Sequence, residues 1–188
     1  MRIIAGFAKG RKLVAPRGRH TRPTAGRVKE AIFSVIAGQL TGSRVLDPFA
    51  GSGSLGLEAL SRGAAEAVMI ENHWPSFQVL RRNLQQSALP GGNIFQGDCR
   101  KIIPAQEGRF DLVFLDPPYN QGYLRQVLEL LLSGDLLTDT ATIIIETDAK
   151  HPEDFTLPEL EVYKKSIYGD TAIYYSRDQR SEVRGRNS

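Results

Sequence analysis

The sequence predicts an α/β protein built on a doubly wound, mostly parallel sheet. First, from Arg44 onward short apolar runs of strand character alternate with segments of helical periodicity, which is typical of successive βαβ units. Second, a glycine-rich turn joins the first of these strands to a helix, as in cofactor-binding folds of this class. Third, Gly169-Asp170 joins two β-like runs near the end, which predicts a hairpin that adds an antiparallel edge.

The chain begins with a basic arm. Residues 3–6 and 12–15 flank a stretch that bears glycine and lysine, which suits a small β-hairpin. Its apolar content is too small for independent stability, so we expect it to lie on the main domain or on a ligand. An extended connector follows to residue 23, after which Thr24 can cap a helix. That helix has one apolar face, formed by Val28, Ala31, Ile32, Val35, Ile36 and Leu40.

The elements of the main domain follow from apolar runs and turn residues. We expect strands at 44–48, 67–71, 93–96, 112–116, 142–146, 162–168 and 171–176. Helical segments lie between them at 55–62, 75–87 and 123–132, with a short turn at 100–103. The expected organisation is a basic arm and connector over residues 1–23, the main domain over 24–176, and a disordered, polar tail over 177–188.

Length and composition are those of one globular domain, with 188 residues, 41% of them hydrophobic and 24% charged. The single cysteine, Cys99, excludes a disulfide framework within the chain and favours a reducing compartment. No apolar run approaches the roughly 20 residues of a membrane span, and no signal-peptide pattern follows Met1. We expect a cytoplasmic monomer without a membrane role.

Charge is distributed unevenly along the chain. Residues 1–30 carry nine basic side chains and one acid, a net charge of +8, whereas the remainder carries −5. A basic arm on a mildly acidic body predicts a polyanionic partner, because lysine and arginine release counterions from phosphates. The residues expected to contact nucleic acid are Arg2, Lys9, Arg11, Lys12, Arg17, Arg19, Arg22 and Arg27.

The turn after the first strand has the features of a cofactor loop. Gly51, Gly53 and Gly56 satisfy the pattern G-x-G-x-x-G, and Glu71 follows at the end of the second strand. Glycines let the backbone approach a ligand, and the acid can accept hydrogen bonds from both hydroxyls of a ribose. The pattern fits a dinucleotide or S-adenosylmethionine. Asp47 favours S-adenosylmethionine, because a carboxylate before the glycines pairs with an ammonium group but repels a pyrophosphate.

Three further features concern the same edge of the sheet. Asp98 ends the third strand, where its carboxylate could accept a hydrogen bond from an adenine amino group or could cap the next helical turn. Cys99 beside it is expected to be a small buried residue rather than a nucleophile. The three histidines are not spaced along the sequence as metal ligands usually are, so we expect no metal site.

The stretch Asp116-Pro117-Pro118-Tyr119 follows the buried run that ends at Leu115. Each proline fixes its own φ and restricts the residue before it, so the turn is stiff and rich in acceptors. Two acceptors suit the N–H groups of an exocyclic amine, and the tyrosine ring can stack on the plane that carries it. We interpret the turn as a holder for a nucleobase that reacts at its amino nitrogen.

Topology would bring these two motifs together. In a sheet of order 3-2-1-4-5, the connections reverse between the first and fourth strands, and ligands bind outside the carboxyl ends of strands at such a point. Asp47 ends the first strand and Asp116 ends the fourth. One acid would then face the cofactor and the other the group to be modified.

The chain resembles the bacterial 16S ribosomal RNA guanine-N2 methyltransferases of the RsmD type. The resemblance rests on stretches along nearly the whole chain: 2–6, 10–11, 22–24, 27–28, 30–31, 46–56, 58–63, 116–119 and 168–171. The glycine loop and Asp-Pro-Pro-Tyr are shared by many amino-methyltransferases, whereas the arm and Tyr168-Gly169-Asp170-Thr171 point to this branch. The resemblance implies a seven-stranded class I methyltransferase sheet and a guanine of 16S rRNA, in an assembled or partly assembled small subunit, as substrate.

The expected reaction is transfer of a methyl group from S-adenosylmethionine to the guanine N2. Asp116 and the Pro117 carbonyl would orient the amine, and Tyr119 would stack on the extruded base, with Pro118 completing the turn. The residues expected to bind the cofactor are Thr24, Asp47, Phe49, Gly51, Ser52, Gly53, Glu71, Asn72, Asp98, Cys99 and Asp116.

Other functions remain open on residue chemistry alone. Adenine and cytosine also carry exocyclic amines, so an RNA or DNA methyltransferase acting on those bases could use the same turn. A nicotinamide-dependent oxidoreductase would use the glycine loop and Glu71 but leaves Asp47 and the Asp-Pro-Pro-Tyr turn without a role. A non-enzymatic RNA-binding factor would need only the arm.

Overall fold

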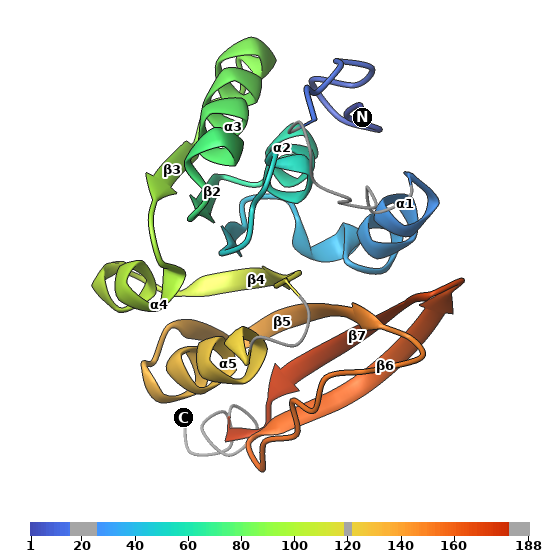
Figure 1. The fold of residues 1–188 in the computed structure, drawn as a ribbon, viewed down its shortest axis with the longest axis vertical. Helices are drawn as coiled ribbons and strands as arrows, with labels where there is room; N and C mark the ends of the chain where they lie inside the picture. Colours follow the sequence, from blue (N-terminus) through green and yellow to red (C-terminus); the bar gives the residue numbers. More distant parts are fainter. Residues whose placement is uncertain (16–25, 119–121, 181–188) are drawn as a thin grey trace. The chain divides into compact units, whose positions relative to one another are not determined.

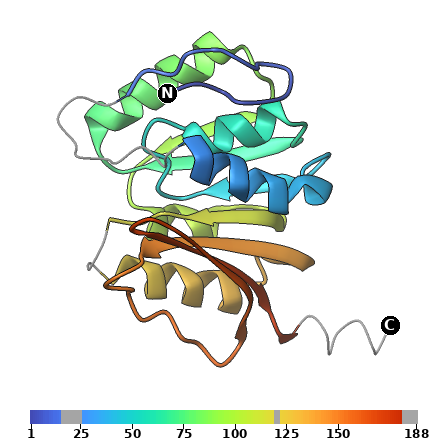
Figure 2. The same cartoon turned by 90° about the vertical axis from the view of Figure 1, so that its right-hand side faces the viewer.

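The computed structural model describes residues 1–15, 26–118 and 122–180 (Figures 1 and 2). Seven strands with their helices form the mixed α/β sheet fold that the sequence predicts. The chain divides into two compact units, Met1–Cys99 and Arg100–Ser188. The finer division into arm, main domain and tail stays a prediction.

The first unit contains three parallel strands, β1 (Arg44–Asp47), β2 (Glu66–Glu71) and β3 (Gly92–Gln96), in the order β3-β2-β1. Asp47 of β1 lies opposite Met69 of β2, and Glu71 of β2 lies opposite Gln96 of β3. Parallel strands end at the same edge of a sheet, so the turns that follow these three strands lie along one edge. The predicted cofactor residues after β1 and β2 are thereby brought together.

The helices of the first unit are α1 (Gly26–Val35), α2 (Ser54–Ser61) and α3 (Trp74–Ser87), with a 3₁₀ turn, η1 (Ala37–Gln39), after α1. The sequence predicts one helix through Leu40, but α1 ends at Val35. The chain then tightens, and the Gln39 amide donates to the Ile36 carbonyl at 2.9 Å, three residues back. The expected cap, Thr24, lies outside the described residues.

The arm lies on the first unit, one of the two locations that its thin apolar content predicts (Figure 2). It forms a loop closed by a single antiparallel bridge between Arg2 and Lys12 rather than a hairpin of two strands. Backbone bonds join Ile3 to Gly10 and Arg11 across the loop, and the residues between them also bond to α2. The amide of Phe7 donates to the Ser61 carbonyl at 2.7 Å, and the amide of Ala8 donates to Ser61 Oγ at 2.9 Å.

A buried carboxylate, Glu58 of α2, fixes the start of the arm. Its oxygens accept the backbone amides of Ile4 at 2.8 Å and Ala5 at 3.0 Å, the Lys29 ammonium of α1 at 2.9 Å and Arg62 Nε at 2.8 Å. Burial alone would raise the pKa of Glu58, but these donors hold the pKa below its ordinary value. Burial lowers the pKa of Lys29, although Glu58 opposes that shift. Hydrogen bonds and ion pairs from these four donors offset the cost of removing the carboxylate from water.

The second unit contains α4 (Cys99–Ile102) at its border, the 3₁₀ turn η2 (Ile103–Ala105), β4 (Phe110–Leu115), α5 (Tyr123–Ser133), β5 (Leu137–Asp148), β6 (Leu160–Tyr168) and β7 (Thr171–Asp178). Its strands run in the order β4-β5-β7-β6. β4 and β5 are parallel, and β7 pairs antiparallel with both β5 and β6. The predicted hairpin is confirmed, and its second strand lies inside the sheet.

Element boundaries in the second unit differ from the sequence prediction, most of all at the start of β5. β5 begins at Leu137 rather than at Thr142, because Phe110 pairs with Leu137 before the register shifts, and the extra residues between Leu137 and Thr142 lie on β5. Its polar start, Thr138-Asp139-Thr140, hides that part of the strand from a hydrophobic pattern. The last strand, predicted to end at Ser176, continues to Asp178 as β7.

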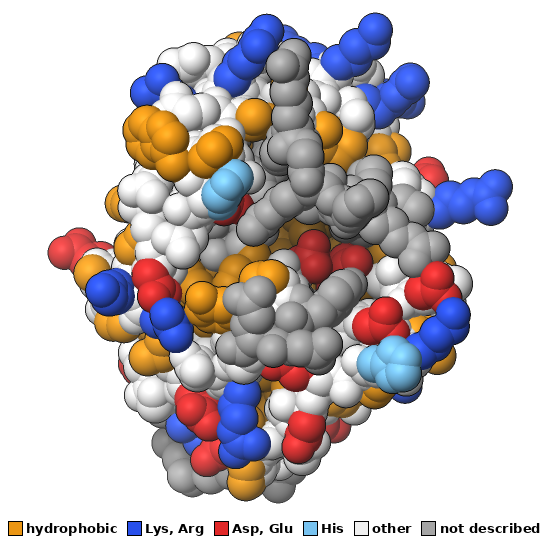
Figure 3. Space-filling model, viewed as in Figure 1, with side chains coloured by type: hydrophobic (Ala, Val, Ile, Leu, Met, Phe, Trp, Pro, Cys, Tyr) orange, Lys and Arg blue, Asp and Glu red, His pale blue; other side chains and the backbone are white. Residues whose placement is uncertain are grey.

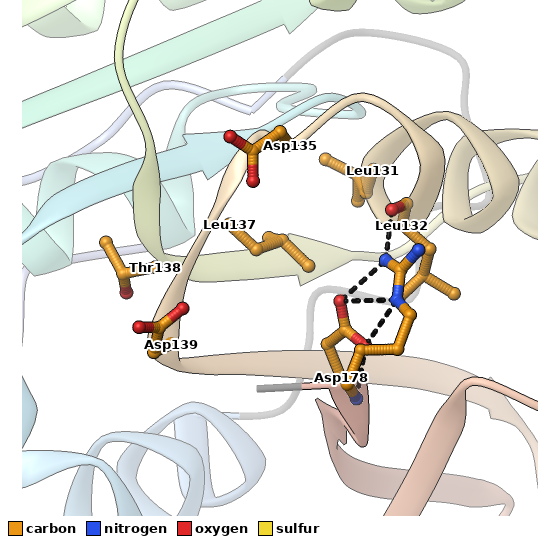
Figure 4. A pocket seen from close by; sticks show the side chains of 8 residues that line it. Leu131, Leu132, Asp135, Leu137, Thr138, Asp139 and Asp178 are labelled. Carbon is orange, nitrogen blue, oxygen red and sulfur yellow. Dashed lines mark hydrogen bonds and ion pairs between the residues drawn. The ribbon is translucent and has the colours of Figure 1, made fainter. Parts of the chain in front are cut away.

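Arg180 anchors the end of β7 in the second unit (Figure 4). Its guanidinium contacts the carboxylate of Asp178 at 2.6–3.2 Å and donates to the Leu132 carbonyl at the end of α5. These residues border a small hollow, and none of the predicted site residues lines it. The residues that line the hollow are Leu131, Leu132, Asp135, Leu137, Thr138, Asp139, Asp178 and Arg180. None of the helices among the described residues is long and apolar enough to cross a membrane.

Replacing Glu58 by alanine should lower the free energy of unfolding by about 3–5 kcal/mol, because the change removes the carboxylate that pairs with the buried Lys29 ammonium and accepts two arm amides. Glu129→Ala is the matched control. Glu129 pairs with Arg125 at 3.0 Å on the surface of α5, and its loss should cost about 0.5 kcal/mol or less. Urea unfolding of both variants measures the difference, and equal costs would contradict the role given to Glu58.

Candidate active site

The turn between β1 and α2 is the first part of the candidate site. The amide of Ala50 donates to the Ile70 carbonyl of β2 at 2.9 Å, and the amide of Gly53 donates to the Ala50 carbonyl at 2.7 Å. Gly51 and Gly53 have φ values of +57° and +82°, a region that favours glycine. The loop is therefore a fixed structure with its backbone fastened to the neighbouring strand.

The two glycines serve different purposes. A Cβ at Gly53 would lie 2.5 Å from Leu80 Cδ1 of α3, so this glycine lets the loop pack on the helix. A Cβ at Gly51 would meet no atom within 4 Å. Gly51 is thus the position where the backbone is open to a ligand, as the sequence pattern predicts for a glycine of this loop.

Two buried acids lie at this edge of the first unit. Asp47 is 3% exposed, and its Oδ2 accepts the amide of Gly56, in the first turn of α2, at 3.2 Å. Glu71 is 6% exposed; its Oε2 accepts the Gly51 amide at 2.9 Å and its Oε1 accepts the His73 amide at 2.7 Å. A carboxylate has about four acceptor sites, so the two bonds that Glu71 makes to these amides do not use its full capacity. Two negative charges therefore border the glycine loop.

Asn83 of α3 fastens the arm to the glycine loop, a role that sequence reasoning missed. The side chain is fully buried, and its Nδ2 donates to the carbonyls of Ser52 at 2.8 Å and Val14 at 3.0 Å. Its Oδ1 accepts the Val14 amide at 2.9 Å. The only sequence signal was a polar residue on the apolar side of an amphipathic helix, and such a residue does not reveal its partners.

The remaining predicted cofactor residues surround these turns or lie outside the described chain. Asp98 is half-buried and directly precedes α4, a position consistent with both an adenine acceptor and a helix cap. Cys99 is 4% exposed, as expected for a small buried residue. Ser52 is buried, Phe49 is half-buried, and Asn72 is exposed, with its carbonyl accepting Gln96 Nε2 at 3.1 Å. Thr24 lies outside the described residues.

The acceptor turn begins directly after β4, in the second unit. Asp116 is half-buried, Pro117 is buried and Pro118 is exposed, whereas Tyr119 lies outside the described residues. Burial raises the pKa of Asp116 to about 6. The side chain is therefore mostly a carboxylate at neutral pH, yet far more basic than an ordinary aspartate, which suits a group that accepts hydrogen bonds or a proton.

The basic residues of the arm are mostly exposed. Arg2, Lys9, Lys12 and, on α1, Arg27 all face solvent. Arg11 has a structural partner, because its NH1 donates to the carbonyls of Gln86, at 2.9 Å, and Ser87 at the end of α3. A cation there complements the helix dipole. Arg17, Arg19 and Arg22 lie outside the described residues.

Among the described residues, no group of three or more His, Cys, Asp and Glu side chains is arranged to hold a metal ion. His73 makes a local contact instead, with its Nδ1 at 3.1 Å from Ser76 Oγ.

Comparison with known proteins gives a consistent result. Residues 1–177 match the family model described as "Conserved hypothetical protein 95". The chain is 37% identical to the "Putative rRNA methyltransferase YlbH" of Bacillus subtilis, over 94% of this chain and 100% of that protein. It is 33% identical to the "Ribosomal RNA small subunit methyltransferase D" of Escherichia coli K12, over 97% of this chain and 92% of that protein.

Solved structures show the same fold. The "Putative methyltransferase yhhF" from Escherichia coli aligns with a TM-score of 0.84 and 33% identity, covering 95% of this chain and 98% of that chain. A methylase structure from Haemophilus influenzae, also titled as putative, aligns with a TM-score of 0.78 and 31% identity, covering 94% and 97%. The predicted class I methyltransferase fold is thereby confirmed.

Alanine at Gly53 should destabilise the fold more than alanine at Gly51. Both changes force a side chain into a left-handed backbone, at about 1–2 kcal/mol. The Gly53→Ala methyl must also displace Leu80, which adds about 1–3 kcal/mol, whereas the Gly51→Ala methyl enters open space. Urea unfolding of the two variants measures this difference. Equal losses would contradict the assignment of Gly53 to packing.

The raised pKa of Asp116 predicts a pH-dependent gain in stability for Asp116→Asn. The carboxyl has a pKa of about 6 in the folded chain and an ordinary value of 3.8, so between these values the folded state holds more protons than the unfolded state. The free energy of unfolding of the parent therefore falls as pH rises through this interval. The variant should be the more stable protein at about pH 7.5, and its advantage should vanish toward about pH 4. An advantage that is constant in urea unfolding across this range would contradict the assigned pKa shift.

Proposed function

We propose a function from one premise: this chain belongs to the Conserved hypothetical protein 95 family, the family of the RsmD-type ribosomal RNA methyltransferases. The protein is an S-adenosylmethionine-dependent methyltransferase that acts on ribosomal RNA. Its acceptor is the exocyclic N2 of a guanine in 16S rRNA, within an assembled or partly assembled small subunit. This action would take place in the cytoplasm, with the chain as a monomer.

The observation that carries the proposal is the pair of buried acids on the glycine loop, Asp47 and Glu71. A dinucleotide would bring a pyrophosphate to the start of α2, where the buried Asp47 carboxylate would repel it. S-adenosylmethionine brings an ammonium group, a sulfonium and a ribose diol. One carboxylate can pair with the cation, and the other can accept hydrogen bonds from the two ribose hydroxyls. The open backbone at Gly51 supports close approach of such a ligand. The donor and acceptor set therefore fits S-adenosylmethionine and does not fit a nicotinamide dinucleotide.

Asp47 would hold the ammonium of the cofactor, and Glu71 would accept the ribose hydroxyls while its bond to Gly51 keeps the loop in place. Asp98, just before α4, would accept from the adenine amino group. When bound, S-adenosylmethionine supplies an electrophilic methyl, and its carbon–sulfur bond breaks as the new carbon–nitrogen bond forms.

The turn after β4 would hold the base. The Asp116 carboxylate and the Pro117 carbonyl would accept the two amino hydrogens and direct the nitrogen lone pair toward the methyl. Tyr119 would stack on the base once it is extruded from the RNA. The amino group becomes acidic as it is methylated, and a carboxylate with a pKa of about 6 can take the departing proton at neutral pH. Positioning and electrostatics supply most of the rate, because a conjugated amine is a weak nucleophile.

The choice of guanine and of the small subunit is supported by the family and by the names of the relatives, not by residue chemistry. A methyltransferase directed to adenine or cytosine is the second candidate, since Asp116 and Pro117 would accept the hydrogens of any exocyclic amine. The buried carboxylate of Asp47 argues against the oxidoreductase.

The proposal is tested by label transfer from S-adenosylmethionine to three substrates in parallel: naked 16S rRNA, assembled small subunits and DNA. Mass spectrometry of the nucleosides identifies the product. We expect N2-methylguanosine in RNA and no label in DNA. A labelled adenosine or cytidine would overturn the choice of base, and the absence of transfer to any substrate would overturn the proposed activity.

Asp116→Ala should lower the transfer rate by about 10²–10⁴-fold while cofactor affinity persists, because the change removes the acceptor for the amine and its proton. Asp111→Ala is the matched control. Asp111 lies on β4 as well, where it accepts Thr138 Oγ1 at 3.1 Å, and its loss should leave the rate nearly unchanged. Initial rates and calorimetric titration with S-adenosylmethionine measure the two effects. An Asp116→Ala variant that stays active on RNA would show that the assigned role is wrong.

A further inference from the structure

We propose that Phe7 is an RNA-binding residue on which an unpaired base of the substrate stacks. This inference rests on the proposed function, because it takes the substrate to be RNA. It adds that a single-stranded segment of this RNA binds to the arm, outside the methyl-transfer site. Phe7 carries no charge, so the charge pattern that predicts the arm's RNA contacts does not select it.

The exposure of Phe7 is unlike that of the chain's buried phenylalanines. Its side chain is 89% exposed, whereas Phe33, Phe110 and Phe114 are at most 1% exposed. Every other large apolar residue among the described exposed ones is 59% exposed or less. Leaving an aromatic ring in water forgoes a favourable burial, and a base that stacks on the ring would recover part of it.

The backbone around Phe7 is fixed on both sides, so the ring cannot fold inward. The preceding Gly6 has a φ of +80°, and a Cβ there would lie 1.7 Å from the Ser61 carbonyl oxygen. The Phe7 amide donates to that same carbonyl at 2.7 Å, and the next residue, Ala8, is buried with its amide on Ser61 Oγ at 2.9 Å. Because the backbone that carries the ring is already fixed, stacking of a base on the ring costs no further backbone entropy there.

The surroundings of Phe7 are cationic. Residues 1–15 contain no acid, and exposed Lys9 follows Phe7 by two residues. Arg2 and Lys12 are exposed on the bridge that closes the loop. Lys and Arg side chains line the upper margin of the face in Figure 3, where the N-terminal segment and α3 lie in Figure 1. These charges provide phosphate contacts on either side of the ring.

This combination indicates single-stranded RNA rather than a protein partner. A protein interface needs a contiguous apolar centre, but in the loop between Arg2 and Lys12 the other large apolar side chains are Ile3, which is buried, and Ile4, which is half-buried. A single aromatic ring among cations is the pattern with which proteins bind single-stranded nucleic acid, through stacking and phosphate contacts.

The test is the affinity of the full-length chain for a single-stranded oligoribonucleotide, measured over a series of salt concentrations. Phe7→Ala should weaken binding about 5- to 150-fold, the usual effect of losing one stacked base, with no change in the salt slope. Phe7→Tyr should restore binding. Lys9→Ala is the matched comparison, because it should weaken binding and also reduce the salt slope by about 0.7.

A second measurement reports stacking directly. The chain has one tryptophan, Trp74, so Phe7→Trp in a Trp74→Phe background places a single fluorophore in the arm. We expect its fluorescence to be quenched when RNA is added. An unquenched spectrum at saturating RNA would overturn the proposal.

The outcomes separate this inference from the proposed function. If Phe7→Ala binds the oligoribonucleotide like the parent, the ring does not stack on RNA and the inference is wrong. If the parent transfers no methyl group to any RNA, the proposed function fails, whereas the binding and quenching measurements still decide the role of Phe7. Point variants are preferable to deletion of the arm, since deletion would leave Glu58 and Asn83 without their bonds to it.

Discussion

One buried carboxylate, that of Glu58, controls how the first unit is assembled. It lies on the helix that the glycine loop starts, and it binds the backbone of the arm and the ammonium of α1. Asn83 makes the corresponding connection from α3, with bonds to the arm and to Ser52 in the loop. The arm, the cofactor loop and three helices are thus held by two polar side chains. A segment that would otherwise be a loose basic tail becomes a surface of defined shape.

Much of this fold could be predicted because its signals are local. Alternating strand and helix patterns, the glycine loop and the Gly169-Asp170 hairpin each follow from short stretches of sequence, and the structure contains the corresponding elements. The meeting of Asp47, Gly51 and Glu71 at one edge of the first unit also follows, since parallel strands end together. The errors lie where polar residues continue a strand, as in Thr138-Asp139-Thr140, or where a helix tightens into a 3₁₀ turn after Val35.

The long-range polar contacts could not be predicted. Glu58 and Asn83 each bond to residues more than 50 positions away, and a polar residue on a helix gives no indication of its partner. The same limit explains why the partner of Arg11 was not foreseen. Its charge suggested a phosphate contact, but its guanidinium binds the end of α3. The limit also explains Phe7, because a lone phenylalanine in a glycine-rich stretch is expected to be buried. Its exposure depends on the fit between Gly6 and Ser61, far apart in sequence.

The position of β7 inside the second unit affects the order in which this protein can fold during its synthesis. β1, β2 and β3 pair with neighbours that leave the ribosome in succession, so their sheet can form as the chain emerges. β5 and β6 both pair with β7, which is translated after them, so both present unpaired backbone until residues up to Asp178 are available. Twelve-residue β5, which is buried along most of its length, is therefore the segment most in need of protection in a nascent or truncated chain. A stop codon shortly before β7 would remove only a short part of the chain but leave that strand without its antiparallel partner.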